Sequence, residues 1–395
     1  MKTTIIKLAS LFTLVLLIQS CAQPQERIHT SFNQNWKFSK GEIGKEHFAI
    51  FDDTSWRTLN LPHDWAIEGP FDKQYDARTG GLPIYGTAWY RKAFTIEASQ
   101  KGNQVSLEFD GVMNNAEVYL NGQKVGKRPF GYIGFEVDLT PFIKFGEENV
   151  VAVRVDPKEL SARWYPGAGI YRNVYLTIKN PVNIAYNGTY ITTPTITNKE
   201  AEVVIETTLQ NKGNLKGNFE LKTTILNNEG IIVSSSKSTI EDFSKSISQR
   251  ILVENPTLWD LNSPSLYTAT SVLLKKGIAV DNYETTFGIR SINYSKENGF
   301  ELNGKQVKFK GVCLHHDLGP LGSAVNYRAT ERQLEIMKSI GVNAIRTSHN
   351  PPSPEQLELC DKMGILVQVE AFDEWAIPKV ENGYNKIWEE WHERW

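Results

Sequence analysis

The sequence predicts a multidomain protein in which an all-β jelly-roll sandwich and an immunoglobulin-like β-sandwich precede the first three βα units of a parallel α/β domain. Short alternating strands with polar turns run from about residue 28 to residue 287. After residue 288 the pattern changes to strand, helix, strand, helix, strand, which is typical of a parallel sheet. The chain has 395 residues, which is long enough for two or three domains.

Residues 1–21 are predicted to be a lipoprotein signal peptide and are excluded from the fold. Lys2 and Lys7 give a positively charged start, residues 8–18 are apolar but too short to span a bilayer, and Cys21 follows the small residue Ser20. A plain secretory signal is the alternative. We expect Cys21 to carry lipid, which would make the protein an exported bacterial lipoprotein anchored to a membrane, periplasmic or at the cell surface.

The overall composition excludes some classes of partner. The formal net charge is −2, and the Lys and Arg residues are scattered, so no basic patch indicates nucleic-acid binding. Apart from Cys21 the chain has only Cys313 and Cys360, which is no disulfide framework. Both are flanked by apolar residues, and we expect both to be small core residues.

The predicted jelly roll spans residues 28–179. Residues 105–109 and 151–155 alternate between apolar and polar, and the Asn121-Gly122 pair predicts a β-hairpin because both residues tolerate positive φ. Two irregular loops, at residues 61–65 and 161–172, combine aromatic rings with charged residues. Such loops suit a sugar, whose C–H faces stack on rings while its hydroxyls bind polar groups; satellite core packing is the alternative.

The predicted immunoglobulin-like domain spans residues 181–287. Strands are expected at residues 201–210, 217–226, 231–235, 247–254 and 266–275. The region has no cysteine pair and no cluster of titratable groups with aromatic residues. We therefore expect it to be a spacer.

The last region, residues 288–395, begins with a hairpin predicted at Asn303-Gly304. Helices are expected to begin at Thr330 and Ser353, each followed three residues later by Gln as in a capping box, and the second to end at Gly364. The apolar strands between them fit a doubly wound sheet or an eight-stranded barrel. A barrel cannot close after three strands, so a barrel would mean that the sequence is the N-terminal part of a longer protein.

Polar residues follow the end of each predicted parallel strand, where they would share one mouth. They are His315, His316 and Asp317; Arg346, Ser348, His349 and Asn350; and Glu370, Asp373, Glu374 and Trp375. This set is compatible with a metal site, a general acid/base site or a saccharide site with Trp as its floor. The adjacent His315 and His316 lack the spacing of zinc ligands.

Several motifs, in order, resemble the family 2 glycoside hydrolases, the group of β-galactosidases, β-glucuronidases and β-mannosidases. They are LPHDW at 61–65, WYPGAGIYRNV at 164–174, LWD at 258–260, FGIR at 287–290, KGV at 310–312, NAIRTSHNP at 343–351 and DKMGILV at 361–367. The resemblance covers about residues 30–395. It implies a sugar-binding jelly roll, an immunoglobulin-like domain and a TIM (β/α)8 barrel, of which residues 288–395 are the truncated N-terminal part.

The resemblance also implies roles for individual residues. His315 and His349 match positions that contact the glycosyl unit, and Asp64 matches one that reaches in from the jelly roll. Glu374 matches an acidic active-site residue that can bind magnesium, but Ala376 stands where metal-dependent members have His, so we expect no metal cofactor. From their places at the strand ends, Arg346 and Trp375 are also expected to bind substrate.

The function implied is retaining hydrolysis of terminal β-linked sugars in oligosaccharides, with β-D-galactosides favoured by Asp64 and the motif at 164–169. β-Glucuronidase and β-mannosidase activity are the alternatives within the family. The family's acid/base Glu follows Asn after the fourth barrel strand, and its nucleophile follows the seventh. Neither occurs in this chain, so both catalytic carboxylates are expected downstream and the chain alone is expected to be inactive.

Two readings from other classes remain open at this point. One is a non-catalytic glycan-binding lipoprotein that uses the jelly roll. The other is a metallohydrolase that uses His315, His316, His349 and Glu374. The sequence does not reveal linkage preference, and it leaves open whether the protein forms an oligomer.

Overall fold

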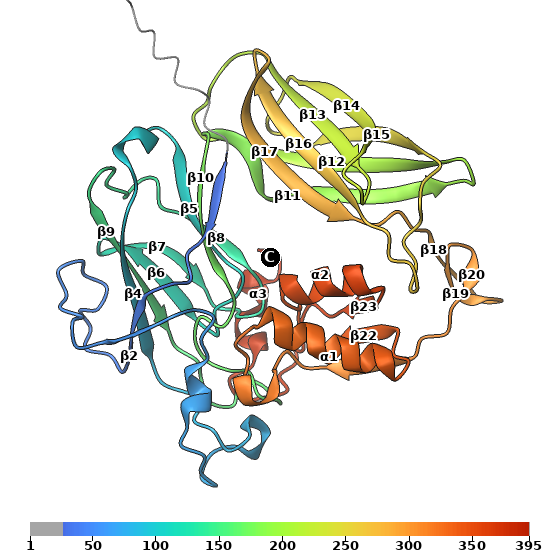
Figure 1. The fold of residues 1–395 in the computed structure, drawn as a ribbon. Helices are drawn as coiled ribbons and strands as arrows, with labels where there is room; N and C mark the ends of the chain where they lie inside the picture. The colour runs from blue at the N-terminus through green and yellow to red at the C-terminus, as the bar shows by residue number, and fades with distance from the viewer. Residues whose placement is uncertain (1–26, 395) are drawn as a thin grey trace, which may run out of the picture.

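A computed structural model of the chain describes residues 27–394. The predicted signal peptide and Cys21 lie outside this range. Figure 1 shows two β-sandwiches and a smaller α/β part, in which α1 and α2 lie beside a short parallel sheet. The predicted fold class is confirmed. Within residues 27–394 no helix combines the length and the apolar character needed to cross a membrane.

The jelly roll consists of two antiparallel sheets packed face to face. The six-stranded sheet has the order β3 (Arg57–Leu59), β2 (Trp36–Lys40), β4 (Ala88–Thr95), β9 (Glu148–Val155), β6 (Ala116–Leu120) and β7 (Gln123–Arg128). The four-stranded sheet has the order β1 (Ile28–Ser31), β10 (Val174–Lys179), β5 (Gln104–Phe109) and β8 (Phe135–Asp138). Short 3₁₀ turns occur at η1 (Trp65–Glu68), η2 (Ala77–Thr79) and η3 (Ala98–Gln100).

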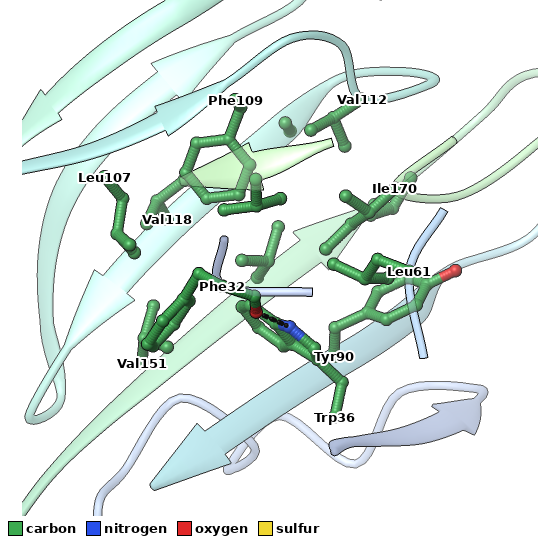
Figure 2. Close-up of a cluster of buried hydrophobic side chains, with 14 of the residues drawn as sticks. Phe32, Trp36, Leu61, Tyr90, Leu107, Phe109, Val112, Val118, Val151 and Ile170 are labelled. Atoms are coloured by element: carbon green, nitrogen blue, oxygen red, sulfur yellow. Dashed lines mark hydrogen bonds between the residues drawn. The ribbon is translucent and has the colours of Figure 1, made fainter. Parts of the chain in front are cut away.

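Side chains from both sheets form one apolar core, part of which Figure 2 shows. Trp36 is fully buried there and donates its indole N–H to the carbonyl of Phe32 at 2.8 Å, so the polar atom of the ring is satisfied inside the core. In β5 the alternation of apolar and polar residues is as predicted, but the polar residues are buried too. Glu108, for example, accepts a hydrogen bond from Thr177 at 2.7 Å.

The two predicted hairpin turns are present. Asn121 and Gly122 have φ values of 51° and 88° between β6 and β7. Asn303 and Gly304 have φ values of 52° and 72° between β19 (Gly299–Leu302) and β20 (Lys305–Gln306). The β20 strand has only 2 residues, and with β18 (Ile292–Ser295) and β19 it forms a small three-stranded sheet.

The immunoglobulin-like domain has two antiparallel sheets. One has the order β11 (Val182–Ile196), β12 (Glu200–Asn211) and β15 (Ile247–Glu254). The other has the order β14 (Ile232–Ile240), β13 (Phe219–Leu226), β16 (Tyr267–Lys275) and β17 (Ile278–Phe287). The sequence pattern did not identify β11, whose pairing with β12 is interrupted by two register shifts, or β17.

The last part contains three parallel strands with two helices on one face. The sheet order is β21 (Gly311–Leu314), β22 (Ala344–Thr347) and β23 (Leu366–Val369), and the helices are α1 (Tyr327–Ser339) and α2 (Pro354–Met363). Shorter helical turns are η4 (Gly319–Leu321), η5 (Tyr384–Ile387) and α3 (Trp388–Trp391). The parallel pairing predicted from the apolar runs is confirmed.

The helix starts were predicted with mixed success. Ser353 caps α2 as expected, and its hydroxyl accepts from the backbone N–H of Gln356. Thr330 does not cap α1, so that prediction was wrong. The cap is Asn326, whose side chain accepts from the N–H of Ala329 at 3.0 Å and therefore starts the helix one turn earlier.

Gly364 ends α2 in a left-handed conformation with φ of 69°, and a Cβ there would lie 2.4 Å from the carbonyl oxygen of Leu261. We expect Gly364→Ala to destabilise the protein by about 2–4 kcal/mol, because backbone strain and a clash with main chain add together. Gly341→Ala is the matched control, since φ there is 90° but nothing lies within 4 Å of the new methyl. Equal losses in the two thermal unfolding midpoints would contradict the clash argument.

Candidate functional site

Loops of the jelly roll reach the mouth of the parallel sheet. Asp64 accepts hydrogen bonds both from the jelly roll and from the barrel part. Its side chain is only 2% exposed and caps η1 by accepting from the N–H of Ala66 at 3.0 Å. It also accepts from the N–H of Ala168, from the Tyr165 hydroxyl at 2.6 Å, and from both the N–H and the hydroxyl of Ser323. Both carboxylate oxygens are thus used within the protein. The role of Asp64 in sugar binding stays a prediction.

Trp164, from the jelly-roll loop, packs on the two histidines singled out by the sequence. Its ring stacks on that of His315 with centroids 5.2 Å apart and planes 13° apart. The ring of His349 meets Trp164 edge to face at 5.5 Å. His315 is fixed further, because its Nδ1 lies 2.8 Å from the carbonyl oxygen of Ser348. The structure therefore brings His315 and His349 together, with ring centroids 5.8 Å apart.

Glu370 holds Arg346 and His349 in place. One carboxylate oxygen lies 2.8 Å from Nδ1 of His349, and the other accepts from Nε of Arg346 at 2.5 Å. Glu370 follows β23 directly, and Arg346 lies on the neighbouring strand β22. The carboxylate therefore fixes a guanidinium and an imidazole on the same side of the mouth, with charge-assisted hydrogen bonds.

Cys313 lies beside this group and is exposed, so the prediction of a core thiol was wrong for this residue. The reason is the strand alternation of β21: Val312 and Leu314 pack in the core beneath the helices, whereas Cys313 points to the opposite face. Its Sγ lies 3.5 Å from the guanidinium of Arg346, which lowers the pKa of the thiol. Cys360 is buried, as predicted.

Three of the predicted substrate-binding residues, Arg346, His349 and Trp375, line one open hollow of about 980 Å³, which we call the mouth hollow. Glu370, Asp373, Lys379 and Arg163 also line it. Trp375 is 66% exposed, and its ring stacks with that of Trp388 at 6.2 Å. An exposed indole beside charged donors and acceptors is the combination expected for a saccharide surface.

Glu374 lies apart from this group, in a hollow of about 440 Å³ between the jelly roll and the loop after β23. It is 2% exposed, and its Oε1 accepts from the N–H of Lys379 at 3.0 Å. Its Oε2 has no partner within the described residues and lies against Gly383, where a Cβ would be 1.8 Å away. The structure does not bring Glu374 into the mouth hollow.

The donor groups do not fit a magnesium ion at Glu374. Asp373, the neighbouring carboxylate, is paired with Arg163 and Lys379, and Ala376 supplies no ligand. Within residues 27–394, no three His, Cys, Asp or Glu side chains are grouped as a metal would require. The expectation that no metal binds here stays a prediction.

His316 does not enter the mouth, so its placement there was wrong. Its Nε2 lies 3.0 Å from the carbonyl oxygen of Pro166, and its ring contacts the edges of Tyr132 and Tyr171. The ring of His316 lies in the interface with the jelly roll, because there its Nε2 can donate a hydrogen bond to the carbonyl oxygen of Pro166. Burial lowers the pKa of His316 to about 3.

This depressed pKa predicts an acid-dependent loss of stability. Histidine in an unfolded chain has a pKa of about 6.5. Below that pH the unfolded chain therefore binds a proton that folded His316, with a pKa of about 3, does not bind. Its contribution is present above about pH 6.5 and falls toward pH 3, by up to about 1.4 kcal/mol per pH unit. We expect His316→Gln to flatten the fall of the thermal unfolding midpoint between pH 7 and 5. His392→Gln is the control, and equal slopes in all three proteins would contradict the prediction.

The ion pair between Arg163 and Asp373 was missed in the sequence. It joins the jelly roll to the loop after β23, with Nη2 of Arg163 at 2.5 Å from the carboxylate. The two residues are 210 positions apart, so no local pattern reveals the pair. Trp164 begins the motif at residues 164–174 that resembles the family. This motif was the sequence signal that could have placed Trp164 at the site beside His315.

Family models match nearly the whole described chain. The model described as Glycosyl hydrolases family 2, sugar binding domain, matches residues 30–181. The model described as Glycosyl hydrolases family 2 matches residues 183–290, and that of the family's TIM barrel domain matches residues 294–391. The chain belongs to the glycosyl hydrolases of family 2.

Relatives of this chain include a beta-galactosidase and a beta-glucuronidase. Beta-galactosidase BoGH2A of Bacteroides ovatus is 45% identical over 380 residues, covering 95% of this chain and 44% of the relative. A beta-glucuronidase of Formosa agariphila is 32% identical over 369 residues, covering 86% of this chain and 38% of the relative. The chain therefore spans less than half the length of these curated relatives.

Solved structures agree with the fold. A family 2 member from Bacteroides cellulosilyticus has a TM-score of 0.89 at 38% identity, covering 93% of this chain and 48% of that one. A beta-glucuronidase from Bacteroides uniformis has a TM-score of 0.80 at 30% identity, covering 90% and 44%. The match of residues 294–391 to the family's TIM barrel domain confirms the barrel prediction over the doubly wound alternative.

Proposed function

We propose that this chain supplies the sugar-binding wall of a retaining β-glycosidase that removes terminal β-linked sugars from oligosaccharides. The observation that carries the proposal is the group formed by Glu370, Arg346 and His349 beside Trp164 and His315. Three strand ends and one jelly-roll loop build it from opposite sides. Imidazole and guanidinium nitrogens suit sugar hydroxyls, and the exposed indole of Trp375 in the mouth hollow suits the C–H face of a sugar ring.

The residues named above would bind and orient the sugar rather than cleave it. Retaining hydrolysis needs a nucleophilic carboxylate and an acid/base carboxyl about 5–5.5 Å apart. Glu370 is occupied by Arg346 and His349, and Asp373 by Arg163 and Lys379. We propose that neither Glu370 nor Asp373 is one of the two reacting carboxylates.

We propose β-D-galactosides as the preferred substrates, supported by the relative of 45% identity named beta-galactosidase. The relatives named beta-glucuronidase support the second candidate. The test is an assay of the protein expressed from the complete gene on nitrophenyl β-galactoside, β-glucuronide and β-mannoside. A larger kcat/KM on either of the last two would overturn the galactoside proposal.

Two further outcomes of that assay separate other classes of protein. Binding of galactose without hydrolysis of any substrate would favour the glycan-binding lipoprotein. Loss of activity in EDTA would contradict the prediction that the protein has no metal cofactor.

We also propose that Cys21 carries a lipid and anchors the protein outside the cytoplasmic membrane, periplasmic or at the cell surface. The support is the sequence of residues 1–21, with its positive start, apolar stretch and cysteine after a small residue. Metabolic labelling with an alkynyl fatty acid should mark the wild-type protein and not Cys21→Ser. Labelling of both proteins, or of neither, would refute the anchor.

A further inference from the structure

A further polar hollow, distinct from the mouth hollow and from the hollow at Glu374, lies where the immunoglobulin-like domain meets the barrel part. It has a volume of about 520 Å³, and we call it the junction hollow. Its walls come from β11, from the residues that follow β17, and from the C-terminal half of α2. Figure 1 shows the immunoglobulin-like domain adjoining α2.

Arg290 is the main donor in this hollow. Its guanidinium packs over the ring of the buried Trp259 at 4.9 Å. Its five N–H groups have no acceptor within the described residues, and Arg290 lines the hollow. The backbone of Arg290 is fixed by Thr193, whose hydroxyl donates a hydrogen bond to the carbonyl of Arg290 at 2.8 Å.

Asp361 faces the same hollow and forms no ion pair within the described range. Its position is fixed by α2 and by its backbone carbonyl, which accepts from the indole N–H of Trp259 at 2.8 Å. Arg290 and Asp361 attract each other without forming a direct ion pair. One wall therefore offers hydrogen-bond donors and the other acceptors, with a gap between them.

The chemistry of this gap selects the ligand. An anion would be attracted by Arg290 but repelled by Asp361. A cation would be attracted by Asp361 but repelled by Arg290. A hydroxyl accepts from Arg290 and donates to Asp361, so it satisfies both. Tyr190, which also lines the hollow, is 69% exposed and offers a ring on which a sugar face can stack.

We propose that the junction hollow is an auxiliary saccharide-binding site, separate from the mouth hollow. It would hold a neutral sugar through Arg290 and Asp361, with Tyr190 as the stacking surface. A site of this kind would keep an oligosaccharide or polysaccharide on the protein while its end is processed elsewhere. The region taken for a spacer in the sequence would then take part in binding.

The test is hydrogen–deuterium exchange during a lactose titration of the protein. We expect lactose to protect segments 190–194 and 286–292. Arg290→Gln and Asp361→Asn should each raise the lactose concentration for half protection by about tenfold or more, because each removes a charged hydrogen-bond partner. The matched control is Arg250→Gln, which changes an exposed arginine of the immunoglobulin-like domain that pairs with Glu202.

The outcomes decide the proposal without reference to hydrolysis. No protection of these segments in the wild type would overturn the proposal, and so would a titration midpoint in both hollow variants equal to that of the wild type. Protection by sodium sulfate instead of lactose would make the hollow an anion site and would also overturn it. Protection of residues 370–379 reports on the mouth hollow separately, so failure here is distinguishable from failure of the glycosidase proposal.

Discussion

Asp64→Ala is expected to destabilise the protein by about 3–5 kcal/mol, because it removes a buried charge whose hydrogen-bond partners then remain unsatisfied. The partners come from both sides of the domain interface: Ala66, Tyr165 and Ala168 from the jelly roll and Ser323 from the barrel part. A large fall in the thermal unfolding midpoint, with earlier proteolysis between the domains, is the expected measurement.

Two further variants show whether the loss comes from the interface. Ser323→Ala removes one hydroxyl donor at 3.0 Å and keeps the backbone donor, so it should cost only about 1 kcal/mol. Asp64→Asn keeps the shape but offers one acceptor atom instead of two, so its loss should lie between the others. If Asp64→Ala unfolds like wild type but binds galactose less tightly, Asp64 acts on the sugar and the structural argument fails.

The sequence predicted those turns, helix caps and strands that are determined by residues close together in the chain. The Asn-Gly turns and the Ser353 cap are set by a few consecutive side chains, and the parallel strands by short apolar runs. The first helix start was missed because Thr330 and Asn326 both qualify as caps, and only packing chooses between them. The strand β11 was not identified because its pairing with β12 is interrupted by two register shifts, which neighbouring residues in the sequence do not reveal.

The sequence predicted which strand ends lie together at the candidate site, but it did not predict the hydrogen bonds that the side chains there form. Arg346 and His349, at the end of β22, line one hollow with Glu370, which follows β23, because parallel strands end at a common edge. The direction of each side chain after the strand depends on contacts distant in sequence. His316 turns to Pro166 across 150 positions, and Asp64 bonds Ser323 across 259.

These contacts suggest how the jelly roll takes part in the site. Trp164 stacks on His315, and Arg163 pairs with Asp373 beside the mouth hollow. Arg172 is buried and donates to the carbonyls of Pro351 and Pro352, directly after the loop that carries His349. The jelly roll therefore fixes the loops after β22 and β23 from one side, and a mutation there can alter sugar binding without contacting the sugar.

Glu370→Gln is expected to lower kcat/KM by about 100-fold in the protein expressed from the complete gene, because loss of positioning at a site carries a cost of that order. The amide keeps the shape of the carboxylate but cannot accept from both Arg346 and His349 as an anion does. Both side chains would then be free to leave the geometry that Glu370 imposes. The measurement is steady-state hydrolysis of nitrophenyl β-galactoside, with galactose affinity as a second readout.

The fold should tolerate this change, which separates positioning from stability. Glu370 is partly exposed, with 21% of its side chain accessible, so we expect a small shift in the thermal unfolding midpoint. Glu358→Gln is the matched control: it breaks the surface ion pair with Lys362, whose side chains are both 50% exposed, and should leave both activity and stability nearly unchanged. If Glu370→Gln hydrolyses the substrate within twofold of wild type, the carboxylate does not position the sugar. Arg346 and His349 would then have to be held by Trp164 and the strand ends alone.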